Sequence, residues 1–152
     1  MSNFRKFTRR IAATTAVSGI VALAALAGAG TAAANTDPAD APPGYAGPFA
    51  TCNGEPYVQI TVPGTPGYVD IRRDYAGSGT FCAKTFDNLA GDHHIEIILQ
   101  RVDWSTRWYD SGTYSTYAGG IYVSGANTHC TRVYGEITVN DQAHTTGWQV
   151  VC

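Results

Sequence analysis

The chain has 152 residues, with ten lysines and arginines against twelve aspartates and glutamates. All twelve acidic residues but only six basic ones follow residue 34, so the chain after that point carries a formal charge of −6. Such a charge disfavours nucleic acid and anionic lipid as partners.

Residues 1–34 have the layout of a secretory signal peptide. Four basic residues precede an uncharged run over 11–29 and a small-residue cleavage site at 32–34. A retained anchor is the alternative, because 19 uncharged residues nearly span a bilayer. The run is mostly alanine, glycine, threonine and valine, which insert weakly. We therefore expect a secreted protein that starts near Asn35 and has no membrane contact after cleavage.

Residues 35–48 contain four prolines among alanines, glycines and aspartates. Proline fixes φ and removes a backbone donor, so this segment is predicted to be a flexible lead-in without structured elements. Residues 49–152 are then of a size typical of one domain.

Short β-prone runs separated by glycine and proline turns fill the rest of the chain. Period-two alternation and β-branched residues predict strands, at 57–62, 68–73, 80–86, 113–117, 121–124, 131–140 and 147–152. Apolar residues on both faces of 95–104 predict a central strand there.

Two glycine-containing stretches, Asp110–Gly112 and Ala118–Gly120, are predicted to turn or break the chain. Gly135 falls on the inward side of the strand at 131–140, where a bulge or a close neighbour is expected. No segment after residue 34 has a helical period. The sequence therefore predicts an all-β domain, a single antiparallel β-sandwich or barrel of about seven or eight short strands.

The four cysteines all lie in the part that we expect to be exported, and an even number there indicates two disulfides. Three pairings are possible. We predict Cys52–Cys82 and Cys130–Cys152, because each then joins strands close in sequence. His129 directly precedes Cys130, which is the wrong spacing for two ligands of one zinc ion, so no metal or other cofactor is expected.

The stretch Asp110–Val123 reads D-S-G-T-Y-S-T-Y-A-G-G-I-Y-V, and C-T-R-V-Y-G follows at 130–135. These residues resemble the spore-associated protein A family, small secreted proteins of spore-forming filamentous bacteria. The likeness covers roughly residues 52–152 and departs from the family's pattern at Gly120, where the family often has proline, and at 92–108. The resemblance implies a spore- or cell-surface-associated protein with no established activity.

A second resemblance concerns Asp110, Gly112 and Tyr114, whose spacing is similar to the tyrosine corner of immunoglobulin-type sandwiches. In those domains a cysteine follows the tyrosine by two residues, but Thr116 stands there in this chain. The immunoglobulin disulfide is therefore absent, and the corner is expected as a local device in another Greek-key sheet.

His94 and Glu96 lie in the most polar cluster of the domain and would share one face of a strand. Such a pair could serve as general acid and base in a small secreted hydrolase or nuclease. The alternative is a polar loop that runs into a strand, and we favour it, so no enzymatic activity is expected.

Nine tyrosines and three tryptophans are many for a chain with so few charges. Tyrosines that project from the solvent face would form an amphipathic binding surface, and the candidates are Tyr68, Tyr114, Tyr117, Tyr122 and Tyr134. The alternative is that these rings form cross-strand pairs that cover the sheet.

A non-enzymatic structural or adhesive protein of the spore or cell wall is the function that we expect. A secreted protease inhibitor is the other alternative. It would need an exposed rigid loop, for which the segment Asp103–Gly112 is the candidate.

Overall fold

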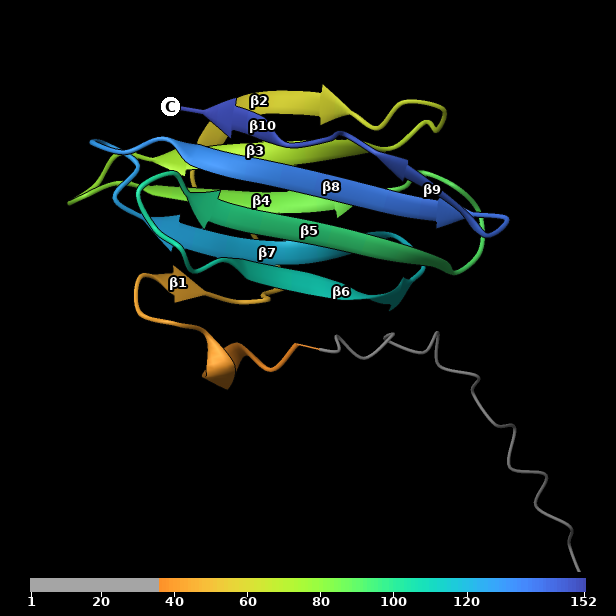
Figure 1. Ribbon diagram of the computed structural model, residues 1–152, viewed down its shortest axis with the longest axis horizontal. Helices are drawn as coiled ribbons and strands as arrows, with labels where there is room; N and C mark the ends of the chain where they lie inside the picture. Colours follow the sequence, from red (N-terminus) through yellow and green to blue (C-terminus); the bar gives the residue numbers. More distant parts are fainter. Residues whose placement is uncertain (1–35) are drawn as a thin grey trace, which may run out of the picture. The chain divides into compact units, whose positions relative to one another are not determined.

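The computed structural model describes residues 36–152. The signal-peptide prediction concerns residues that lie outside this range. Figure 1 shows the described part as two layers of strands that run along its long axis. Among residues 36–152, no helix is long and apolar enough to cross a bilayer.

The first layer, sheet A, has five strands. In spatial order they are β1 (Tyr45–Ala46), β7 (Tyr117–Ser124), β4 (Thr80–Phe86), β3 (Tyr68–Asp74) and β2 (Glu55–Thr61).

The second layer, sheet B, contains β10 (Gln149–Val151), β8 (Thr131–Val139), β5 (His93–Arg101) and β6 (Trp108–Tyr114), in that order. Strand β9 (Gln142–Thr145) also pairs with β8, beyond the end of β10. All neighbouring strands are antiparallel. The predicted all-β fold is confirmed, and it is a sandwich.

The core lies between the two sheets. Alternating residues of the long strands face inward and are fully buried, among them Val69, Ile71, Phe81, Ile95, Ile97, Leu99, Val133 and Ile137. Gly135 lies on the inward side of β8, as expected. A Cβ at this position would collide with Val69 and approach Thr85 Oγ1 to 2.9 Å. The glycine therefore allows the sheets to approach closely at this point.

Both disulfides have the predicted pairing. Cys52 and Cys82 have their Cα atoms 5.6 Å apart, and the bond fixes the segment before β2 to β4. Cys130 and Cys152 have theirs 4.2 Å apart, and that bond ties the end of the chain to the start of β8.

The turn predicted at Asp110–Gly112 is wrong, because these residues lie inside β6. The composition of this segment is typical of a turn, but the carboxylate of Asp110 is buried and is hydrogen-bonded by groups of the protein. Asp110 Oδ1 accepts the hydroxyl of Tyr114 at 2.6 Å, and Oδ2 accepts the N–H of Gly119 at 2.7 Å. Tyr114 thus bonds to a side chain, whereas the tyrosine of an immunoglobulin corner bonds to backbone.

The break predicted at Ala118–Gly120 is a bulge inside the single strand β7. Ile121 pairs with Ala83, but the next pair is Gly119 with Lys84, so Gly120 is the extra residue. Gly119 and Gly120 have φ of 114° and 78°, values that strongly favour glycine.

The lead-in is ordered from Thr36 onward, contrary to the flexible segment that we expected. Pro38–Asp40 forms a 3₁₀ turn, and β1 adds to the edge of β7. The anchor is Tyr45, which is 8% exposed, and its hydroxyl donates to the carbonyl of Thr106 at 2.8 Å. The prolines are compatible with this structure because only Tyr45 and Ala46 of the lead-in pair with a sheet, and neither is a proline.

The period-two alternation of residues 57–62 is typical of a half-buried strand, but six of the seven residues of β2 are exposed. It is the outer strand of sheet A, and a register shift lies between Pro56 and Val58. The strand therefore has no consistently buried face, and the apolar contact is made by Val62 just beyond its end, which is fully buried.

Candidate functional site

The tyrosines singled out in the sequence do not share one surface. Tyr114 faces the core and is 8% exposed, so its ring is not available to a partner, and its expected place on a binding surface is wrong. Tyr68, Tyr117 and Tyr122 lie on the outer face of sheet A, whereas Tyr134 lies on the outer face of sheet B.

Residues 49–54, which we name the strap, cross the outer face of sheet A. The ammonium group of Lys84 donates to the carbonyl of Ala50, and the hydroxyl of Tyr117 donates to the same oxygen at 3.2 Å. Lys84 also lies 3.7 Å from the centre of the Tyr117 ring. Burial, followed by the nearby charge of Arg72, lowers the pKa of Lys84. Lys84 and Tyr117 therefore hold the strap in place.

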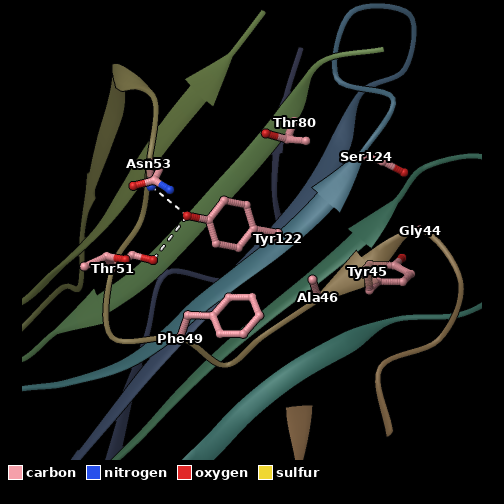
Figure 2. Close-up of a pocket in the computed structure, with 9 residues that line it drawn as sticks. All are labelled: Gly44, Tyr45, Ala46, Phe49, Thr51, Asn53, Thr80, Tyr122 and Ser124. Atoms are coloured by element: carbon pink, nitrogen blue, oxygen red, sulfur yellow. Dashed lines mark hydrogen bonds between the residues drawn. The ribbon is translucent and has the colours of Figure 1, made fainter. Parts of the chain in front are cut away.

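Tyr122 has a similar part in fixing the strap (Figure 2). Its hydroxyl accepts the N–H of Asn53 at 2.6 Å and donates to the carbonyl of Thr51 at 3.2 Å. Its ring packs at a tilt against Phe49, with centroids 5.9 Å apart. The hydroxyl of Tyr122 is therefore already hydrogen-bonded, and its ring is in contact with Phe49.

A hollow of about 630 Å³ lies between the strap, β1 and β7. Figure 2 shows the rings of Phe49 and Tyr122 along this hollow, with Ala46 nearby. No acidic or basic side chain is among the nine residues that line it. The hollow is suited to a small neutral ligand and is one of two candidate binding sites on the described part of the protein.

The outer face of sheet B carries an aromatic row that crosses the strands. Cross-strand pairing aligns Tyr109 of β6, Ile98 of β5 and Tyr134 of β8. The ring of Trp148 extends this row, 5.4 Å from the ring of Tyr134. Tyr109 and Trp148 are 42% and 45% exposed. Ile98 is only 8% exposed although it faces outward, because these rings flank it.

A polar row runs parallel to the aromatic row. It aligns one residue from each of four adjacent strands, Ser111, Glu96, Glu136 and Thr145. Ser111, Glu96 and Glu136 are each two positions along their strand from a member of the aromatic row, which separates the rows by about 7 Å. Thr145 continues the polar row on β9. Sheet B therefore presents apolar rings and hydrogen-bonding groups in two adjacent lines.

The two glutamates of the polar row stand directly opposite each other. Burial, followed by the charge of Glu136, raises the pKa of Glu96. The hydroxyl of Tyr134 donates to Glu136 Oε2 at 2.6 Å. Burial and this bond raise the pKa of Tyr134 to about 12. The Tyr134–Glu136 bond links the aromatic row to the polar row.

The His94–Glu96 pair lies on this same open face. His94 is exposed, and its Nε2 lies 3.3 Å from Ser111 Oγ. Its only hydrogen-bond partner in the described part of the chain is thus a neighbouring hydroxyl. Neither residue lines the hollow beside the strap.

The expected inhibitor loop at Asp103–Gly112 is a loop over only half of its length, residues 103–107. Strand β6 begins at Trp108, which is 7% exposed and donates its indole N–H to the carbonyl of Gly47 at 2.8 Å. Trp104 packs edge-on against Tyr45, with centroids 5.3 Å apart. Both tryptophans are therefore held by contacts within the protein and do not project from a free loop.

Sequence reasoning missed Tyr109, Trp148 and Glu136 as members of the site. Placing a turn at Asp110–Gly112 hid the alternation of β6, in which Tyr109 faces outward. The alternation of the strand at 131–140 places Glu136 on its outward side, opposite to Gly135, but the residue that faces Glu136 on β5 depends on strand register.

Within residues 36–152, no three His, Cys, Asp or Glu side chains are grouped to hold a metal ion. Comparison of the chain with protein-family models, with curated proteins and with solved structures found no match.

Proposed function

We propose that the protein is a non-enzymatic binding protein of the bacterial cell or spore surface, and that it attaches through the outer face of sheet B. The observation that carries this proposal is the aromatic row. A contiguous group of exposed apolar side chains is typical of a surface that contacts a partner.

The two faces of the sandwich differ in how their rings are used. On sheet A, Tyr117 and Tyr122 hold the strap through their hydroxyls. On sheet B, Tyr109 and Trp148 are nearly half exposed, and Val150, two residues after Trp148 at the same edge of the sheet, is 60% exposed. No segment of the described chain covers these residues as the strap covers sheet A. This difference favours sheet B as the binding face.

Attachment to a spore or cell wall is supported by the family resemblance and by the expected export signal. The two disulfides are compatible with an extracellular protein. A formal charge of −6 disfavours attraction to anionic wall polymers. The aromatic row would therefore carry the adhesion.

Co-sedimentation with washed spores and cell-wall material across a salt series tests the proposal. Binding should persist at moderate salt, because charge interactions are screened beyond about 8–10 Å whereas apolar contacts are not. The variants Trp148→Ala and Tyr134→Ser should bind less. The control is Tyr75→Ser, which removes a ring that is 57% exposed but lies outside the row. Folded wild-type protein that stays in the supernatant at every salt concentration would contradict the proposal.

A further inference from the structure

We propose that the ligand of this face is an uncharged, extended glycan strand that lies across the strands of sheet B. Its sugar rings would stack on the aromatic row and its hydroxyls would meet the polar row. This inference rests on the proposed function and names the chemistry of the ligand.

The shape of the aromatic row favours a chain-like ligand. Tyr109 and Tyr134 are two strands apart, which separates them by about 10 Å. Trp148 continues the line beyond Tyr134. The row therefore extends across the strands, although the rings of Tyr134 and Trp148 are tilted by 41° to each other. An extended polymer can contact several rings of the row at once. A compact ligand would contact only one end of it.

The chemistry of the two rows matches the two aspects of a sugar ring. A pyranose ring presents an apolar face of C–H groups and a rim of hydroxyls. Tyrosine and tryptophan offer large apolar faces to the former. The carboxylates of Glu96 and Glu136 accept hydrogen bonds from the latter, and charge-assisted bonds of this kind are stronger than neutral ones.

The charges of the polar row favour an uncharged polymer over an anionic one. Glu96 and Glu136 face each other, and like charges opposite one another destabilise a sheet. An anionic ligand would add to this repulsion, whereas hydroxyl donors would relieve it. On the other side of the aromatic row lie Gln100 and Arg132, which pair across β5 and β8. The Nε2 of Gln100 already donates to the carbonyl of Trp104 at 2.9 Å, and the exposed guanidinium of Arg132 adds further donors. An uncharged glycan satisfies both sides.

Titration calorimetry of the mature protein with soluble β-linked oligosaccharides of glucose and of N-acetylglucosamine tests the inference. Polygalacturonate serves as the anionic comparison. We expect binding to at least one neutral oligosaccharide that changes little with salt, and none to polygalacturonate. Trp148→Ala and Tyr109→Ala should each weaken binding roughly tenfold, and Tyr75→Ser should leave it unchanged.

The carboxylates provide a second readout. Glu136→Gln keeps the shape but removes the charge, so it should weaken glycan binding several-fold. Binding to neutral oligosaccharides that is unchanged in both the aromatic and the Glu136 variants would overturn the inference.

Failure of the inference can be separated from failure of the proposed function. If the protein sediments with wall material but neither binds the soluble neutral oligosaccharides nor is displaced from the wall by an excess of them, the ligand is not a glycan of this class although surface attachment stands. If it binds oligosaccharides but no spore or wall preparation, the glycan inference holds and the surface assignment fails. If it binds neither, both are wrong.

Discussion

Tyr114 donates its hydroxyl to Asp110 Oδ1 over 2.6 Å, four residues away on the same strand of sheet B. The second oxygen of Asp110 accepts the N–H of Gly119 on sheet A. A single buried carboxylate thus connects the two sheets. Burial raises the pKa of Asp110, and both hydrogen bonds act to lower it.

Replacing Tyr114 with phenylalanine should destabilise the fold by about 1–3 kcal/mol, because a buried carboxylate loses a donor. The loss applies to the ionised carboxylate. It should therefore be largest at neutral pH and shrink as the pH falls through the pKa of Asp110, which lies above the ordinary value near 3.8. Urea unfolding of Tyr114→Phe and wild type at neutral and acidic pH measures this. A loss that is the same at every pH would contradict it.

Glu96→Gln should stabilise the protein at neutral pH by about 0.2–1 kcal/mol, since it removes one of two opposed like charges. The folded-state pKa of Glu96 is raised, so the ionised form is the less stable one, and the wild type loses stability as the pH rises through that pKa. The advantage of the variant should therefore vanish at acidic pH. His94 and Arg107 offset part of the repulsion.

Thermal unfolding of Glu96→Gln and wild type over a pH series measures the difference in stability. Glycan titration of the same variant measures its effect on binding. A variant that is more stable yet binds less tightly would indicate that Glu96 is retained for binding. A variant that is less stable at neutral pH would show that the opposed charges are not a cost to the fold.

Each disulfide should contribute about 3–4 kcal/mol in the loop-entropy model, as the cysteines are 30 and 22 residues apart. Such a contribution is a large part of a small domain's stability. The paired variants Cys52→Ser/Cys82→Ser and Cys130→Ser/Cys152→Ser, compared by guanidinium unfolding, measure it separately. Wild-type stability in either pair would show that the bond is dispensable.

Lys84→Met should loosen the strap, because the carbonyl of Ala50 loses a charged donor and the Tyr117 ring loses a cation. The expected cost is about 1–3 kcal/mol, confined to local opening if the disulfide to Cys82 remains intact. Limited proteolysis should then cleave within residues 49–54 faster than in wild type. Tyr68→Ser, on the same face but without a hydrogen bond to the strap, is the control. Equal cleavage rates in all three proteins would argue against this role of Lys84.

Much of the fold follows from local sequence signals. The alternation of Val133, Gly135 and Ile137 gave the inward face of β8 correctly, and the close approach at Gly135 was expected from its place in that pattern. The disulfide pairing was also predictable from the cysteines that are near in sequence. Cys130 and Cys152 flank the neighbouring strands β8 and β10, whereas Cys52 reaches Cys82 of β4 because the strap crosses the outer face of sheet A.

The candidate site was less predictable because it depends on register. Glu96 and Glu136 are far apart in the chain, and only the pairing of β5 with β8 brings them together. A shift of one residue would turn either side chain into the core. Tyr45 was missed for another reason. It lies among prolines, and only its tertiary contacts order the lead-in.

Hydroxyl-radical footprinting of the protein, free and bound to washed wall material, is the most direct test of binding through sheet B. Protection on binding should fall on Tyr109, Tyr134 and Trp148, while Tyr75 stays as reactive as in the free protein. Protection confined to Phe49 and Tyr122 would place the ligand in the hollow beside the strap and contradict binding through the aromatic row.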